Sequence, residues 1–208
     1  MYKIKEIYYT IQGEGFHTGR SAVFCRFSGC NLWTGREKDR DKAVCKFCDT
    51  DFWGTDGLNG GKYSADVLTQ KILSLWPDKS IPCFVVCTGG EPALQIDDHL
   101  VSTFHRSGIE MAIETNGTVP LANGIDWVCV SPKADTDIVV QSGDELKLVY
   151  PQQENQPEDF LHLKFSHFYL QPLDDPNRAV NTQKTIDYCL KHPQWKLSVQ
   201  THKYLGID

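Results

Sequence analysis

Short apolar runs alternate with amphipathic stretches along the chain, and this alternation constrains the fold more than any other feature. The runs are rich in β-branched or aromatic residues and are closed by Gly, Pro or polar residues, which is typical of strands. They cover residues 84–90, 109–117, 127–133, 145–151, 168–172 and 195–205. Residues 65–76, with Ser64 as N-cap, and residues 92–107 and 177–191 are predicted to be helical. Strands that alternate with helices predict an α/β fold built on a parallel sheet.

Polar clusters follow most of the predicted strands at the point where each strand ends. These clusters read CTGGE, ETNG, SPK, QPLDD and QTHK. Because the carboxyl ends of parallel strands meet at one edge of a sheet, we expect these side chains to converge on a single mouth. Such convergence favours an enzyme.

Composition narrows the class of protein and its partners. A chain of 208 residues that is 40% hydrophobic and 23% charged has ordinary globular usage, which predicts a single domain over residues 1–208. The formal charge of −6 argues against a nucleic-acid partner, since such proteins usually carry a basic stripe. The N-terminus has no apolar signal core and no run approaches a membrane-spanning length, so we expect a cytoplasmic protein without a membrane partner.

The eight cysteines divide into two groups by their surroundings. Five lie in apolar runs or in a helix-like stretch and are interpreted as buried, reduced side chains; they are Cys25, Cys83, Cys87, Cys129 and Cys189. The other three, Cys30, Cys45 and Cys48, lie among turn-forming and charged residues, with fourteen residues between the first two.

Three clustered thiols are one fewer than a closed tetrahedral zinc site needs. His17 is a candidate fourth ligand for zinc, although its spacing matches no usual zinc motif. A [4Fe–4S] cluster with one iron free of protein ligands suits three cysteines better, because the open iron can then bind a small molecule. Both interpretations remain open from the cysteines alone.

The segment TGGEP at residues 88–92 directly follows a predicted buried strand. Its two glycines allow a close approach of the backbone to a ligand, and Glu91 can accept hydrogen bonds from an amine. A plain turn between a strand and a helix is the alternative interpretation of this segment.

Taken together, the motifs resemble those of the radical S-adenosylmethionine (SAM) enzymes and, within them, the family of 7-carboxy-7-deazaguanine synthases. The resemblance covers essentially the whole chain. It rests on YTIQGEG (9–15), FCRFSGCNLW (24–33), CKFCDTDF (45–52), TGGEP (88–92), ETNGT (114–118), SPK (131–133), QPLD (171–174) and QTHK (200–203).

The resemblance implies an abridged, partly open (β/α)6-type barrel with shortened or missing helices. Radical SAM enzymes usually place three residues between their first two cluster cysteines, so the fourteen residues at 31–44 are an insertion in the cluster-binding loop 30–48. A subset of this synthase family shares the insertion, which keeps the number of cluster ligands.

The resemblance also implies the cofactors and the residues that bind them. Cys30, Cys45 and Cys48 would ligate a [4Fe–4S] cluster, and SAM would bind its fourth iron and be cleaved to start a radical reaction. The implied SAM-binding residues are Phe47, Gly89, Gly90, Glu91, Glu114, Asn116, Ser131, Pro132, Lys133, Gln171, Pro172, Leu173 and Asp174. Thr50 is the expected protein ligand of Mg²⁺, with Asp49 beyond it; a turn that merely closes the loop is the alternative.

The implied reaction converts 6-carboxy-5,6,7,8-tetrahydropterin to 7-carboxy-7-deazaguanine with loss of ammonia, a ring-contracting carbon–nitrogen lyase step in queuosine biosynthesis. The residues expected to bind this small-molecule substrate are Ile11, Gln12, Gly13, Glu14, Arg26, Thr88 and Asp208. Arg26 suits the substrate carboxylate because a guanidinium can bind it through two hydrogen bonds, although an exposed edge-strand Arg is the alternative. Flavodoxin or ferredoxin is the expected electron donor, and a homodimer is the expected assembly.

Two other function classes share part of this motif set. An activase that places a glycyl radical on a partner protein shares the cluster and GGE motifs but lacks IQGEG and QTHK. A zinc-binding interaction module needs no catalysis.

The C-terminal tail KLSVQTHKYLGID is predicted to continue the last strand, with Leu197 and Val199 on its buried face and no helix after it. Its end would then place the α-carboxylate of Asp208 beside the pterin. A frayed chain end is the alternative.

Overall fold

The computed structural model describes residues 1–207, and its centre is one nine-stranded sheet in the order β3-β1-β2-β4-β5-β6-β7-β8-β9. Strands β2 and β4–β9 pair in parallel, whereas β1 and β3 at one edge are antiparallel. The two edge strands β3 and β9 do not pair, so the predicted partly open barrel is confirmed.

The strands predicted at residues 84–90, 109–117, 127–133, 145–151 and 168–172 are all present, whereas the strands at residues 2–11 and 61–63 were not predicted. The strands are β1 Tyr2–Ile11, β2 Ser21–Phe27, β3 Gly61–Tyr63, β4 Cys83–Gly89, β5 Ile109–Thr115, β6 Trp127–Val130, β7 Ser142–Tyr150, β8 Lys164–Pro172 and β9 Trp195–Leu197. Every residue of β4 from Cys83 to Thr88 is buried, as expected for a central parallel strand covered on both faces.

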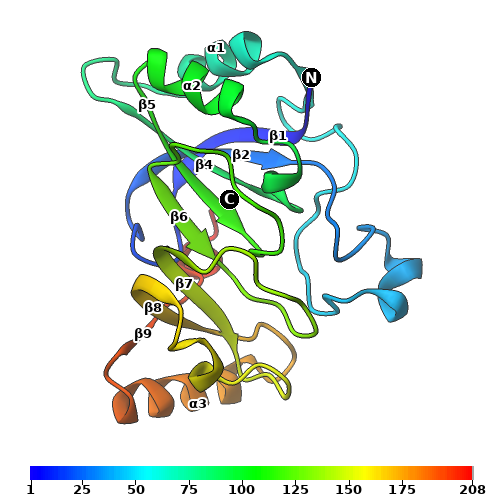
Figure 1. Cartoon of the computed structure of the whole chain (residues 1–208), viewed down its shortest axis with the longest axis vertical. Coiled ribbons are helices and arrows are strands. Elements are labelled where there is room, and N and C mark those ends of the chain that lie inside the picture. The colour runs from blue at the N-terminus through cyan, green and yellow to red at the C-terminus, as the bar shows by residue number, and fades with distance from the viewer. Residues whose placement is uncertain (208) are drawn as a thin grey trace.

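The helices are few, and Figure 1 shows the first two at one end of the sheet and the third at the other. They are α1 Ala65–Leu75, α2 Asp98–Arg106, α3 Arg178–Lys191 and α4 Thr201–Leu205, with 3-10 turns at Glu37–Lys42, Pro92–Leu94 and Pro157–Phe160. The connections from β5 to β6 and from β6 to β7 contain no helix among the described residues, which confirms the abridged barrel.

The predicted helix over residues 92–107 is wrong in its first half. A 3-10 turn ends at Leu94, and α2 begins only after Asp97, whose side chain accepts a 2.9 Å hydrogen bond from the Leu100 amide. An Asp that caps the helix at this point starts a new helix, because its β-region backbone cannot continue the earlier turn. The N-cap predicted at Ser64 is confirmed.

Two apolar cores hold the sheet. The larger lies between α1, α2 and strands β1, β2, β4 and β5, and includes Phe27, Phe84 and Phe104. The smaller lies beneath α3 against β6–β9 and includes Trp195 and Leu146. Cys25, Cys83, Cys87 and Cys129 are buried in this framework and Cys189 is half-buried in α3, with no disulfide among the described residues.

The predicted strand over residues 195–205 is wrong beyond Leu197. The chain leaves the sheet at Ser198, turns inward, and forms the short helix α4, which ends at the left-handed Gly206 (φ +66°). Leu197 is 40% exposed and Ser198 is buried, so the alternation in the tail has the opposite phase from the predicted one. Asp208 lies outside the described residues.

The loop after β1 closes the open side of the barrel. The Gly15 amide donates to Ser198 Oγ at 2.9 Å, and the Thr201 amide donates to the Gly13 carbonyl at 2.9 Å. The loop thereby joins the first strand of the chain to the segment that follows the last one. Residues 12–15 lie inside the barrel as a result.

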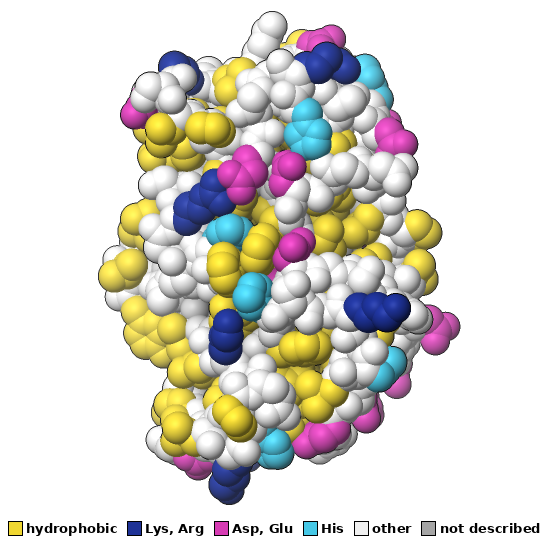
Figure 2. All heavy atoms as spheres, turned by 60° about the vertical axis from the view of Figure 1, so that its left-hand side comes forward, with side chains coloured by type: hydrophobic (Ala, Val, Ile, Leu, Met, Phe, Trp, Pro, Cys, Tyr) yellow, Lys and Arg dark blue, Asp and Glu magenta, His cyan; other side chains and the backbone are white. Residues whose placement is uncertain are grey.

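The amino ends of the strands are closed by an aromatic stack. The Phe16 ring lies 4.7 Å from that of Trp127 and 4.6 Å from that of His167. Arg20 pairs with Glu110 beside them. Histidine and hydrophobic side chains lie together down the middle of the face shown in Figure 2, next to basic and acidic groups.

Within residues 1–207, no helix has the length and apolar character needed to cross a membrane.

Candidate active site

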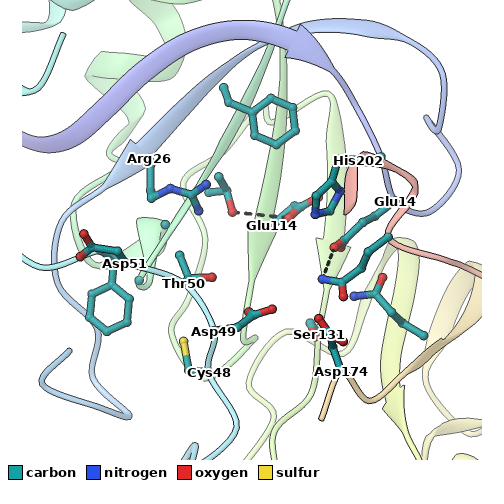
Figure 3. A pocket seen from close by; sticks show the side chains of 18 of the residues that line it. Glu14, Arg26, Cys48, Asp49, Thr50, Asp51, Glu114, Ser131, Asp174 and His202 are labelled. Atoms are coloured by element: carbon teal, nitrogen blue, oxygen red, sulfur yellow. Dashed lines mark hydrogen bonds between the residues drawn. The ribbon is translucent and has the colours of Figure 1, made fainter. Parts of the chain in front are cut away.

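A cavity of about 540 Å³ opens at the carboxyl ends of the parallel strands, within the size range of ligand pockets. Its walls come from the barrel interior, the cysteine loop, the ends of β4–β8 and helix α4 (Figure 3). The polar clusters that follow the strands therefore converge as predicted.

Most of the predicted site residues line this one cavity. They are Ile11, Gln12, Gly13, Glu14, Arg26, Cys30, Cys45, Phe47, Cys48, Thr50, Thr88, Gly89, Gly90, Glu114, Asn116, Ser131, Lys133, Gln171, Pro172, Leu173 and Asp174. Glu91 and Pro132 are buried and do not line it, and the prediction for Asp208 falls outside the described residues.

Cys30 is fixed to the TGGEP turn through the backbone. The Gly90 amide donates to the Phe27 carbonyl at 3.1 Å, and the Glu91 amide donates to the Gly29 carbonyl at 2.8 Å. A Cβ added to Gly90 would lie 2.1 Å from the Gly29 carbonyl oxygen. Glycine is thus required here because the turn passes close to the backbone that carries Cys30, a reason distinct from the ligand approach that the sequence suggested.

Arg40 organises the inserted part of the cysteine loop. Its guanidinium donates to the Lys46 carbonyl at 2.8 Å and to the Cys48 carbonyl at 3.1 Å, and it lies over the Trp33 ring at 4.1 Å. Trp33 packs edge-on against Phe52, so the insertion has a small apolar core of its own. The insertion therefore folds back on the C-x-x-C segment and brings it to the cavity wall.

The three thiols face one cavity but do not form a site for a single metal ion. Within residues 1–207, no group of three or more His, Cys, Asp or Glu side chains is close enough to hold one ion. His17 packs between Phe84 and Trp127 at the opposite end of the barrel, so it is not available as a fourth zinc ligand. A hydrogen bond from Cys45 lowers the pKa of the Cys48 thiol to about 6, which favours a thiolate at neutral pH.

Glu91 has a structural position that the sequence did not indicate. Its carboxylate is fully buried and accepts hydrogen bonds from the Ala93 amide at 2.9 Å, from Thr115 Oγ1 at 2.8 Å and from the Asn116 amide at 2.7 Å. Burial raises its pKa, against the opposing effect of these donors. The carboxylate thus ties the end of β4 to the end of β5 and presents no exposed atom to an amine.

A charged network that the sequence analysis missed lies at the centre of the barrel. Lys147 Nζ lies 2.5 Å from Glu14 Oε2 and 3.5 Å from Glu114 Oε1, and its side chain is 6% exposed. Gln12 Nε2 donates to Glu114 Oε1 at 3.0 Å, and Gln200 Nε2 donates to Glu14 Oε1 at 3.0 Å. One ammonium therefore balances two carboxylates that face the cavity.

The ionisation of this network follows from its geometry. Burial raises the pKa of Glu14, but the adjacent Lys147 ammonium outweighs burial and the pKa falls to about 2. Both carboxylates keep the pKa of Lys147 well above its usual value despite its burial. Glu14 thus offers the cavity an ionised hydrogen-bond acceptor at neutral pH.

Arg26 occupies one wall of the cavity and is already paired. Its Nε donates to Glu6 Oε1 at 2.7 Å, and its Nη2 donates to the Tyr8 hydroxyl at 3.0 Å. The Tyr8 and Phe24 rings stack at 5.6 Å along the same wall. The guanidinium is held rigid by Glu6, and it lines the cavity rather than lying on an exposed edge.

Lys133 is a half-buried cation near the cysteine thiols. Its Nζ donates to both the carbonyl and the hydroxyl oxygen of Ser131 at 2.7 Å. Burial lowers its pKa, whereas the neighbouring Cys45 and Cys48 thiols raise it. The SPK segment therefore places a positive group on the cysteine side of the cavity.

Several lining residues had no assigned role in the sequence analysis. Lys147 is hidden in the apolar run ELKLVY, where it reads as the exposed face of an alternating strand. His202 and Lys203 belong to the quoted QTHK motif but were placed on a strand. One signal in the sequence could have identified Lys147. It is a charged residue inside an otherwise apolar strand, which is the same pattern that identified Arg26.

Comparison with known proteins gave consistent matches over the whole chain. The chain is 58% identical to the 7-carboxy-7-deazaguanine synthase of Burkholderia multivorans over 207 residues, covering 99% of both chains. It is 42% identical to that of Bacteroides thetaiotaomicron over 207 residues, covering 100% of this chain and 99% of the relative. The crystal structure of QueE from Escherichia coli matches with a TM-score of 0.73 at 28% identity, covering 96% of this chain and 93% of the other. No family model matches.

Proposed function

The chain belongs to the family of 7-carboxy-7-deazaguanine synthases, and we propose that its cavity holds the [4Fe–4S] cluster, SAM, Mg²⁺ and pterin substrate that this radical SAM reaction requires. The reaction converts 6-carboxy-5,6,7,8-tetrahydropterin to 7-carboxy-7-deazaguanine with loss of ammonia. The observation that carries the assignment of the site is that three thiols, a threonine hydroxyl and the polar ends of five strands line a single cavity.

Cys30, Cys45 and Cys48 fit a [4Fe–4S] cluster better than a single ion. All three border one cavity, and a four-iron cube held by three thiolates leaves one iron open for a small molecule, whereas a structural zinc ion needs four protein ligands. Arg40 and Lys133 lie beside these thiols and would offset the negative charge of the ligated thiolates. When bound, the cluster supplies the electron that cleaves SAM.

The SAM-binding residues lie on the cysteine side of the cavity. Gly89 and Gly90 line the cavity, and their backbone carbonyls would accept hydrogen bonds from the methionyl amine, since the Glu91 carboxylate is occupied. Asn116 is held by Asn31, whose Oδ1 accepts from Asn116 Nδ2 at 3.0 Å, and it would orient a ribose or carboxylate group together with Ser131. Gln171 to Asp174 also line the cavity and would border the adenosine.

The pterin would bind over the charged network at the barrel centre. Its amino and ring N–H groups need acceptors, which Gln12, Glu14 and Glu114 provide along one edge of the cavity. Lys147 keeps Glu14 ionised, so that this acceptor does not turn into a donor at neutral pH. The substrate carboxylate would pair with Arg26, whose planar group is already fixed by Glu6.

Thr50 would supply the protein oxygen for Mg²⁺. Its amide donates a hydrogen bond to the Cys48 thiol, so its hydroxyl is held at the cysteine side of the cavity. Asp49 and Asp51 flank it (Figure 3). Mg²⁺ keeps several waters and binds through few protein groups plus oxygens of the substrate, which suits a single hydroxyl beside the carboxylate-binding Arg26.

Proton movements in the ring contraction would use Glu114. Thr88 Oγ1 donates to Glu114 Oε2 at 3.4 Å and Lys147 lies beside Oε1, so the carboxylate has a fixed orientation toward the cavity. It can take a proton from substrate carbon and return it to the departing nitrogen, which leaves as ammonia.

The electron would come from a flavodoxin or a ferredoxin, and the active form would be a homodimer in the cytoplasm.

The proposed cluster is tested by anaerobic reconstitution with iron and sulfide. The protein should turn brown and bind about four iron atoms per chain, and any one of Cys30→Ala, Cys45→Ala or Cys48→Ala should lose most of this iron. Cys129→Ala is the matched control, because that buried thiol lies away from the cysteine loop and its loss should cost only stability, about 1–2 kcal/mol. Full iron content in Cys45→Ala would remove the assignment.

A further inference from the structure

Helix α4 borders the mouth of the cavity, although it is short and has no apolar face buried against the sheet. None of its residues, Thr201 to Leu205, is fully buried, so packing alone does not hold it in place. Gln200, His202 and Lys203 nevertheless line the cavity. Polar contacts must therefore fix the helix where it lies.

Lys203 makes the contacts that join α4 to the rest of the site. Its Nζ lies 2.7 Å from Asp49 Oδ2 and also pairs with Asp174 Oδ2. Asp49 stands between Cys48 and Thr50 in the cysteine loop, and Asp174 follows β8 on the adenosine side. Figure 3 shows the two carboxylates on separate segments of the cavity wall.

The two carboxylates need a cation between them. Two negative charges that approach one point from separate segments repel each other, and a half-buried ammonium at that point turns the repulsion into attraction. The side chain of Lys203 is 26% exposed and that of Asp174 is 29% exposed, so water screens the contact only in part. Asp174 is also paired with Arg178 at 3.7 Å, whose guanidinium lies 4.4 Å over the Tyr204 ring.

The other end of α4 is anchored to the loop inside the barrel. Thr201 donates to the Gly13 carbonyl through its amide and its hydroxyl, both at 2.9 Å. A Cβ added to Gly13 would lie 2.4 Å from His202 Nδ1, so the helix rests directly on this glycine. The helix is thus a bridge from the pterin side of the cavity to the cysteine and adenosine sides, and Lys203 is the α4 residue that pairs with a carboxylate on each of the last two.

We propose that Lys203 is a positioning residue that clamps the Cys48–Thr50 segment and the end of β8 to α4, and so closes the cavity around SAM and the substrate together. The proposal rests on the proposed function for the identity of those ligands. Lys203 touches neither reacting group in this scheme; it acts through Asp49 and Asp174.

The clamp can be tested without any cofactor. In the full-length protein free of iron and SAM, Lys203→Met should raise the hydrogen-exchange rate of the amides of residues 201–205 and 49–51 by about tenfold, since local opening there no longer breaks an ion pair. Lys196→Met is the matched control, because this exposed lysine on β9 contacts His167 instead. Unchanged exchange in Lys203→Met would overturn the clamp.

Kinetics separate a clamp from general stabilisation. In the reconstituted enzyme, Lys203→Met should raise the KM of SAM and of the pterin together by about tenfold or more, with kcat changed less than about threefold. Lys203→Arg should restore both KM values, because it keeps the charge between the two carboxylates. Asp49→Asn should partly suppress the Lys203→Met defect by removing one of the repelling charges.

The outcomes distinguish the clamp from the proposed function. If the native protein does not cleave SAM, the proposed function fails and the exchange result still decides the clamp. If the native protein is active and Lys203→Met leaves both KM values unchanged, the clamp is wrong. If Lys203→Met does not fold, Lys203→Gln removes the charge with less loss of polarity. Its hydrogen exchange and its KM values then replace those of Lys203→Met.

Discussion

Lys147 Nζ lies 2.5 Å from Glu14 Oε2 in the interior of the barrel, with the lysine side chain 6% exposed and the glutamate 15% exposed. This ion pair joins the loop after β1 to strand β7, two segments separated by more than half the chain. It therefore contributes both to the closure of the barrel and to the charge of the substrate cavity.

Lys147→Met should destabilise the protein strongly. Removal of one partner leaves buried carboxylates without a counter-charge, which typically costs about 3–5 kcal/mol of unfolding free energy. Lys147→Met combined with Glu14→Gln should recover part of that loss, because the second change removes one of the unpaired charges. Urea denaturation measures both, and a double variant no more stable than Lys147→Met would contradict the account.

Glu145 lies two residues before Lys147 in β7 and is 3% exposed. Its Oε1 and the Nε2 of His17 have no hydrogen-bond partner among the described residues, and a cavity of about 10 Å³ between them has room for one water. Burial raises the pKa of Glu145 above its usual 4.5, against the opposing field of Lys147.

The raised pKa predicts that Glu145→Gln increases the free energy of unfolding by an amount that depends on pH. The neutral carboxyl is favoured in the folded state, so the stability it contributes is present below pH 4.5, the unfolded value, and is lost as the pH rises through the higher folded value. Glu145→Gln should therefore be more stable than wild type at pH 7, with the difference shrinking toward pH 4. Glu154→Gln, in an exposed loop, is the control, and a pH-independent difference between Glu145→Gln and wild type would refute the assignment.

Thr50→Ala tests the proposed Mg²⁺ ligand. Turnover of the reconstituted enzyme should rise with added Mg²⁺ and fall in chelator, and Thr50→Ala should weaken this dependence because the single protein oxygen is lost. Thr55→Ala is the control, because Thr55 is also a threonine in the connection between β2 and β3 but does not line the cavity. Equal wild-type turnover in chelator and in excess Mg²⁺ would dispose of the metal site.

The C-terminal tail gives a prediction for substrate binding. Ile207 lines the cavity, so the chain runs into the site up to that residue. Deletion of Gly206 to Asp208, or a C-terminal tag, should raise the pterin KM about tenfold, the loss expected for one charged hydrogen bond of ~1.5–3 kcal/mol. Uncoupled SAM cleavage should be largely spared, and an unchanged KM in both proteins would mean that the end of the chain does not bind substrate.

The sequence predicted the central strands β4 to β8 well because they are short apolar runs closed by Gly, Pro or polar residues, a local signal, but it did not predict β1 or β3. It failed at Asp97, where a capping residue inside an amphipathic stretch restarts the helix, and at Ser198, where tertiary contacts with Gly15 override the strand pattern of the tail. Both failures arise from contacts or caps that periodicity does not report.

The candidate site was predictable where residues carry a motif and not where they act through distant partners. The cysteines and Thr50 stand in motifs and line the cavity together. Glu91 also stands in a motif, but its hydrogen bonds to Thr115 and the Asn116 amide hold its side chain inside the protein. Lys147 has no motif, since its role depends on a glutamate 133 residues away in the chain.

The most direct test of the account is anaerobic incubation of the reconstituted protein with 6-carboxy-5,6,7,8-tetrahydropterin, SAM, Mg²⁺ and a reductant, followed by analysis of the products. The account predicts 7-carboxy-7-deazaguanine and released ammonia in equal amounts, and neither product from Cys45→Ala. Product formation at the wild-type rate by Cys45→Ala, or none by a wild-type protein that carries its full iron content, would contradict it.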